Sequence, residues 1–77
     1  MDQRHIAAAI RAELGWQNLS QANLALALGW TEAYLSRRIT GQVPFTLADI
    51  SAIAEQLGVP PGRLLETTSP GPGRKAG

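Results

Sequence analysis

The alternation of glycines with capping residues is the feature that most constrains the fold of this chain. Gly15, Gly29 and Gly41 are each followed within five residues by a serine or threonine. Glycine adopts the left-handed backbone that ends a helix at no steric cost, and a Ser or Thr hydroxyl accepts a hydrogen bond from the free amides of the next helix. The segments between these residues repeat apolar positions every three or four residues, the period of a helix. The pattern therefore predicts an all-α fold of short helices.

The first two helices are expected on either side of Gly15. One covers residues 3–14, with Asp2 as its cap and Gly15 at its end, and Ser20 caps the next over residues 21–28. Apolar residues one turn apart mark their buried faces: Ile6, Ile10, Leu14, Leu24 and Leu28.

A longer amphipathic helix is expected over residues 47–57. Thr46 and Asp49 have the spacing of a capping box at its start, and Gly58 closes it. A short proline-started turn or two within 59–66 completes the helices. The apolar residues expected to dock in these two segments are Leu47, Ile50, Ile53, Ala54, Leu57, Leu64 and Leu65.

Composition excludes several classes of protein. The 77 residues contain no cysteine, so disulfides and thiolate nucleophiles are excluded, and His5, the only histidine, has no companion with which to bind a metal. No signal peptide or stretch of roughly 18 apolar residues is present, so we expect a soluble, cytoplasmic protein without membrane contact. We expect one domain over 1–66 and a disordered polar tail over 67–77, where TTSPGPGRKAG offers nothing to bury.

The chemistry of an enzyme is also missing from the sequence. There is no evident nucleophile with a base and no paired carboxylates of a cleft. The stretch GPGRKAG neither follows a strand nor opens a helix, as a phosphate-binding loop would. We expect no enzymatic activity and no cofactor.

Two short helices meet at Gly29. The second covers residues 32–40, with Thr31 as its cap, and Gly41 ends it. A turn of three or four residues that contains a glycine is typical of the helix-turn-helix, whose second helix enters the DNA major groove.

Several motifs strengthen this interpretation. They are Gln21, Ala25, Leu28, Gly29 and Trp30 around the first motif helix, Leu35, Ser36, Arg37 and Gly41 around the second, and Pro44 and Leu57-Gly58-Val59 beyond it. Through these residues the stretch from Asn18 to Glu66 resembles the lambda-repressor-like, Cro and repressor type of helix-turn-helix family. The resemblance implies a compact five-helix DNA-binding domain with Trp30 at the core edge, the alternative being an exposed ring that binds a partner. Trp16 is expected in the loop before the second helix.

The second motif helix divides into two faces. With Leu35 and Ile39 inside, a wheel of about 100° per residue places Arg37 almost opposite them. Arginine suits guanine, glutamate accepts from cytosine, and small apolar groups contact the thymine methyl. The alternative for Glu32 is a favourable interaction with the helix dipole. We expect base contacts from Glu32, Ala33, Ser36, Arg37 and Thr40.

Arg38 departs from the family pattern, which often has an apolar residue at that position. It falls on the flank of the helix together with Tyr34, where a cation meets either a phosphate or an intramolecular carboxylate. Gln21 and Gln42 are phosphate candidates by resemblance. The expected phosphate contacts are Gln21, Thr31, Tyr34, Arg38 and Gln42.

The charge of the domain limits its affinity for DNA. Residues 1–66 hold five arginines and six acidic residues, a formal charge of −1, and only Arg74 and Lys75 make the chain positive. We therefore expect a shallow salt dependence, weak binding by one copy, and a homodimer on a pseudo-palindromic operator. The fifth helix, around Arg63 to Glu66, is a candidate interface.

These features together predict a small transcriptional regulator that binds double-stranded DNA. We expect a repressor of phage Cro or immunity type that occludes a promoter, with no small-molecule ligand. The alternative is an antitoxin-type interaction protein whose main partner is another protein.

Overall fold

Residues 3–65, the part of the chain that the computed structural model describes, contain five α-helices. In chain order they are α1 (Arg4–Gln17), α2 (Gln21–Leu28), α3 (Glu32–Ile39), α4 (Leu47–Leu57) and α5 (Pro61–Leu65). The prediction of an all-α, five-helix fold is confirmed for these residues, none of which forms a strand. The predicted Asp2 cap and the predicted tail over 67–77 lie outside the described residues.

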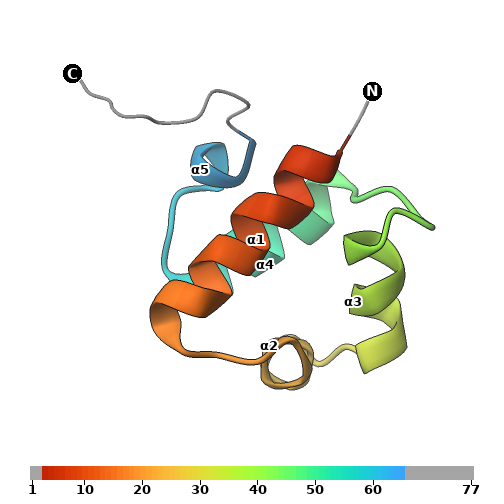
Figure 1. The fold of residues 1–77 in the computed structure, drawn as a ribbon, viewed down its shortest axis with the longest axis horizontal. Coiled ribbons are helices and arrows are strands. Elements are labelled where there is room, and N and C mark those ends of the chain that lie inside the picture. The colour runs from red at the N-terminus through yellow and green to blue at the C-terminus, as the bar shows by residue number, and fades with distance from the viewer. Residues whose placement is uncertain (1–2, 66–77) are drawn as a thin grey trace.

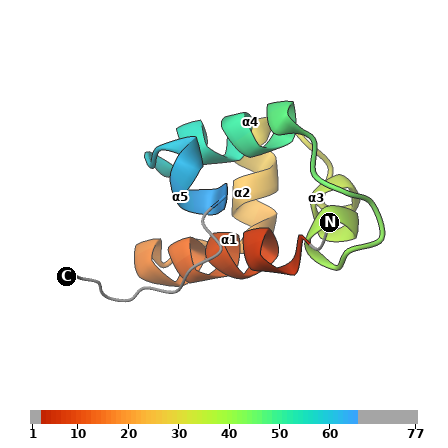
Figure 2. The same cartoon turned by 90° about the horizontal axis from the view of Figure 1, so that it is seen from above.

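The helices surround a single core. Figure 1 shows α1 crossing in front of α4, with α2 seen nearly end-on and α3 to one side. In the perpendicular view of Figure 2, α1 and α4 lie on opposite sides, α2 and α5 lie between them, and α3 stands at one end. This end position leaves the outer face of α3 open to a partner.

Each helix supplies one large side chain that is fully buried. Burial of an aliphatic side chain contributes roughly 1.5–3 kcal/mol, so these five residues fix how the helices meet. They are Ile10, Leu24, Leu35, Ile53 and Leu64.

Two apolar residues do not dock as predicted. Leu47 is 74% exposed because it is the first residue of α4 and the apolar face begins one turn later, at Ile50. The loop residue Phe45 is buried nearby in the sequence, at 5% exposure. Leu65 is 41% exposed because Leu64 takes the inward position of the short α5.

The first helix continues beyond Gly15, contrary to prediction. Gly15 has an ordinary helical backbone, and Asn18 adopts the left-handed conformation instead, with φ of 55°. The Asn18 N–H donates to the Gly15 carbonyl at 3.3 Å, and the Leu19 N–H donates to the Leu14 carbonyl at 2.9 Å. This pair of bonds is a Schellman motif. Asparagine tolerates the left-handed region, so the helix has no need of glycine at its end.

The same motif ends α2, α3 and α4, with Gly29, Gly41 and Gly58 in the left-handed region as predicted. In α2 the Trp30 N–H donates to the Ala25 carbonyl at 2.9 Å, and the Trp30 ring packs against the core. The predicted core-edge position of Trp30 is confirmed. Trp16 lies in the last turn of α1 rather than in a loop, and it is 85% exposed.

The predicted starts of α2, α3 and α4 are also confirmed, whereas α1 begins at Arg4, with Gln3 at its N-cap position. The hydroxyls of Ser20, Thr31 and Thr46 each accept from the amide three residues later at 3.0 Å. The Asp49 carboxylate in turn accepts from the Thr46 N–H, which completes the capping box. Since all three caps are local, the sequence alone was sufficient to place them.

Candidate nucleic-acid interface

The turn between α2 and α3 has the geometry of a helix-turn-helix. Only the three residues 29–31 separate the two helices. Gly29, with φ of 76°, reverses the chain, and Thr31 caps α3 directly after it. Because the chain reversal and the helix cap both lie within the turn, residues of the turn itself determine where α3 begins.

The outer face of α3 carries the five predicted base-contact residues. Leu35 and Ile39 are buried, at 0% and 5% exposure, and anchor the opposite face. At about 100° per residue, the five candidates span an arc of about 140°. Four of them are exposed and Ser36 is half-buried: Glu32, Ala33, Ser36, Arg37 and Thr40.

At the end of α3 the Arg37 side chain is exposed, whereas its backbone carbonyl is hydrogen-bonded. The Arg37 carbonyl accepts from the N–H groups of Gln42 at 2.8 Å and Val43 at 3.1 Å. The Thr40 hydroxyl donates to the Ser36 carbonyl at 2.9 Å, so its oxygen can still accept from a base edge. The Thr40 hydroxyl is thus held by the backbone of its own helix.

The flank of α3 is bound to α4 by a cluster that sequence reasoning only partly anticipated. We call Tyr34, Arg38 and Asp49 the Asp49 tether. The Arg38 Nε donates to Asp49 Oδ2 at 3.0 Å, and the Tyr34 hydroxyl donates to Asp49 Oδ1 at 2.8 Å. The Arg38 Nη1 also donates to the Tyr34 carbonyl at 3.0 Å, and its guanidinium lies 3.5 Å from the centre of the Tyr34 ring.

Arg38 therefore makes the intramolecular ion pair that was the alternative to a phosphate contact. The side chains of Arg38 and Asp49 are 13% and 6% exposed. Trp30 extends the cluster, with its ring 4.6 Å from that of Tyr34. The predicted phosphate contacts of Arg38 and Tyr34 stay predictions.

The pKa values of the tether reflect these contacts. Burial alone raises the pKa of Asp49, but hydrogen bonds from the Thr46 backbone, Tyr34 and Arg38 outweigh burial and leave the pKa below its ordinary value of 3.8. The hydrogen bond to Asp49, together with burial, raises the pKa of Tyr34. Both shifts favour an ionised carboxylate beside a neutral phenol, which is the hydrogen-bonded state of the tether.

Comparison with known proteins agrees with this geometry. A family model described as helix-turn-helix matches residues 10–64, more than half of the chain. The chain belongs to the lambda-repressor-like helix-turn-helix family. Proteins of this family are DNA-binding regulators of transcription and not enzymes, and this chain is a DNA-binding transcription regulator of that kind. Among curated proteins and solved structures, none matches the chain significantly.

The remaining phosphate candidates of this helix-turn-helix protein lie around the motif. Gln21 is the first residue of α2 and is half-buried, and Gln42 is exposed just beyond Gly41. Thr31 is exposed, but its hydroxyl accepts from the Tyr34 N–H. Their contacts with DNA stay predictions.

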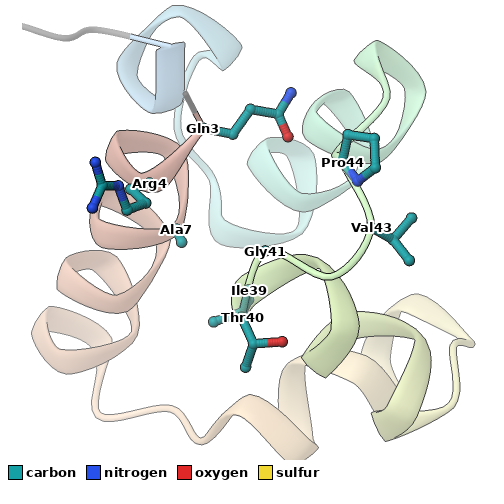
Figure 3. Close-up of a pocket in the computed structure, with 8 residues that line it drawn as sticks. All are labelled: Gln3, Arg4, Ala7, Ile39, Thr40, Gly41, Val43 and Pro44. Atoms are coloured by element: carbon teal, nitrogen blue, oxygen red, sulfur yellow. The ribbon is translucent and has the colours of Figure 1, made fainter. Parts of the chain in front are cut away.

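Gln3 is a residue of the helix-turn-helix domain that sequence reasoning missed. Its Nε2 donates to the Phe45 carbonyl at 3.2 Å and its Oε1 accepts from the Phe45 N–H at 2.7 Å, across 42 residues of sequence. In Figure 3 the Gln3 side chain extends from the start of α1 toward the loop that contains Pro44. Gln3 thus ties the loop after α3 to α1. No local pattern reports a contact between segments so far apart in the sequence.

A cavity of about 610 Å³ opens beside this contact, between the start of α1 and the end of α3. Figure 3 shows the residues that line it: Gln3, Arg4, Ala7, Ile39, Thr40, Gly41, Val43 and Pro44. Within residues 3–65, no three potential metal ligands lie together. Over the same part of the chain, no helix is both long and apolar enough to cross a membrane.

Proposed function

We propose that this regulator is a repressor that occludes a promoter by placing α3 in the major groove of a specific operator. The observation that supports the proposal is the division of α3 into two faces. Leu35 and Ile39 are buried, whereas Arg37, nearly opposite them, is exposed among small and polar side chains. A face of this composition offers the donors, acceptors and methyl groups that read base edges.

The proposed readout assigns a task to each exposed residue. Arg37 donates two guanidinium N–H groups to guanine O6 and N7, and Glu32 accepts from the amino group of cytosine. Ala33 contacts a thymine methyl. Ser36 and Thr40 adapt to whichever base edge lies next to them. Each well-aligned bidentate contact discriminates by about 1–3 kcal/mol against the wrong base.

Phosphate contacts in this proposal come from the uncharged side chains of Gln21, Thr31 and Gln42, because the Tyr34 hydroxyl donates its only proton to Asp49. Because residues 1–66 carry a formal charge of −1, counterion release contributes little to binding. A homodimer on a pseudo-palindromic site, with half-sites about 34–36 Å apart, compensates for the weak binding of one copy. We assign the protein to the Cro or immunity type, whose occupancy depends on its own concentration.

Selection from a randomised duplex pool tests the proposal directly. The full-length protein is expected to enrich a pseudo-palindrome, and Arg37→Ala is expected to relax one guanine position in each half-site. Arg11→Ala is the matched control, because Arg11 is also an exposed arginine but lies on α1. It removes the same charge and should leave the selected sequence unchanged.

Two results would contradict the proposal. If the wild-type protein enriches no sequence at low salt, the operator hypothesis fails, and the antitoxin-type alternative with a protein partner becomes the better explanation. If Arg37→Ala and Arg11→Ala lower affinity equally for every sequence, Arg37 contributes only charge and does not read a base.

A further inference from the structure

The Asp49 tether joins the flank of α3 to α4 through both oxygens of one carboxylate. Both carboxylate oxygens of Asp49 accept from α3, and Oδ2 also accepts from the Thr46 N–H at 3.0 Å. One carboxylate therefore caps α4 and binds α3 at the same time. The side chains of Arg38 and Asp49 are largely withdrawn from solvent.

This inference rests on the proposed function. We propose that Arg38 is a positioning residue that, with Tyr34 and Asp49, fixes the rotation of α3 on α4 and thereby sets discrimination among DNA sequences. The Arg38 charge pairs with the Asp49 carboxylate and does not contact a DNA phosphate.

Rotation is the degree of freedom that the core leaves least defined. Helix α3 has eight residues, and only Leu35 and Ile39 are buried. Apolar contacts are non-directional, so two of them on one stripe resist separation of the helices more than rotation about the helix axis. A rotation of about 10° displaces groups on the helix surface by about 1 Å, whereas a binding site must be held within about 0.5 Å. The hydrogen bonds on the flank of α3 are directional, so they resist rotation of the helix about its axis.

To extend toward a phosphate as a free cation, Arg38 would have to leave three partners. It would abandon the Asp49 carboxylate, the Tyr34 carbonyl and the face of the Tyr34 ring. Asp49 would then hold an ionised, buried carboxylate without its counter-charge, a state that proteins strongly disfavour. The two charges of the tether cancel, so the charges that α3 itself presents to DNA are those of Arg37 and Glu32.

Arg38→Lys separates the two roles. Lysine keeps the positive charge and binds phosphate as a point charge, but it lacks the planar fork that reaches Asp49 and the Tyr34 carbonyl together. If Arg38 is a positioning residue, Arg38→Lys should lose about tenfold in the ratio of operator to random-sequence affinity. Arg38→Gln should lose the same ratio while keeping the slope of log affinity against log salt.

Asp49→Asn gives an independent test because electrostatics alone predicts no change in the ratio of operator to random-sequence affinity, whereas positioning predicts a loss of that ratio. Removal of a negative charge near DNA should strengthen binding to all sequences. Loss of the tether should weaken operator binding relative to random DNA and release Arg38. Glu55→Gln is the matched control, since Glu55 is exposed on the same helix and takes no part in the tether. It should raise both affinities together and leave their ratio unchanged.

The experiment measures affinities of the full-length variants for the selected operator and for random duplex across a salt series, after circular dichroism confirms that each variant is folded. Tyr34→Phe, which removes only the hydroxyl bond to Asp49, serves as the mildest variant and should lose part of the ratio. If Arg38→Lys matches wild type and Arg38→Gln reduces the salt slope by about 0.9, Arg38 is a phosphate ligand and the positioning role is overturned. If the wild-type protein itself selects no operator, the proposed function has failed and the positioning role falls with it.

Discussion

Alanine substitutions at Gly15 and Gly29 should change stability in opposite directions. Gly15 lies inside α1 with a helical backbone, and a Cβ built on it meets no atom within 4 Å. Alanine gains about 0.8–1.0 kcal/mol over glycine in a helix interior, so Gly15→Ala should stabilise the fold by roughly that amount. Gly29 also has open space around a Cβ, but its φ of 76° costs an L-residue about 1–2 kcal/mol.

The two variants should therefore differ by about 2–3 kcal/mol in the free energy of unfolding, since the changes add. For a domain of this size, each 1 kcal/mol moves the midpoint of thermal unfolding by about 4–8 °C. Urea and thermal unfolding followed by circular dichroism measure both quantities. A loss of stability in Gly15→Ala comparable to that of Gly29→Ala would show that α1 ends at Gly15, as the sequence suggested, and would refute the assignment of the helix end to Asn18.

Three further perturbations test the packing and the tether. Asp49→Asn should lower the free energy of unfolding by roughly 1.5–3 kcal/mol at neutral pH. Because the pKa of Asp49 is lowered in the folded state, this loss of stability should persist above about pH 4 and disappear as the pH falls through the folded pKa. A loss of stability that grows in acid would contradict the hydrogen bonds assigned to the Asp49 carboxylate. Leu24→Ala should lower the free energy of unfolding by roughly 2–5 kcal/mol, whereas Leu26→Ala, two residues away and 78% exposed, should change it by no more than about 0.5 kcal/mol. Equal losses would contradict the assignment of Leu24 to the buried face of α2. Gln3→Ala removes two bonds to the Phe45 backbone and Gln17→Ala removes one to the Leu57 carbonyl, at a cost of about 1 kcal/mol per bond. Operator affinity should fall only for Gln3→Ala, because Gln3 holds the loop after α3, whereas Gln17 holds the end of α4; an equal fall in both would show that the Gln3 contact has no specific effect on α3.

Local signals explain what could be predicted from the sequence. Ser20, Thr31 and Thr46 cap their helices through bonds to amides only three residues away, so nothing outside the segment is needed to recognise them. Gly29 likewise ends α2 through hydrogen bonds between residues at most five positions apart. Gly15 misled because a glycine permits a helix end without requiring one, and Asn18 supplied the left-handed residue three positions later.

Tertiary partners explain what could not be predicted. The sequence identified Asp49 as a member of a capping box, but one carboxylate can accept several bonds, and nothing local shows that α3 supplies two of them. The two possible roles of Arg38 could be stated but not separated for the same reason. Gln3 and Phe45 are 42 residues apart and share no pattern, so their contact became visible only in three dimensions.

The division of α3 into separate faces also bears on how such a regulator can acquire a new target. The five outward residues proposed to read DNA are distinct from the residues that hold the helix in place, apart from the Thr40 hydroxyl bond to the helix backbone. A library randomised at those five positions, with Leu35, Ile39 and the Asp49 tether kept, should yield folded proteins with different operators. On the proposed readout, sequence preference in this scaffold should diverge by substitution at these five positions alone, without compensating changes in the interior.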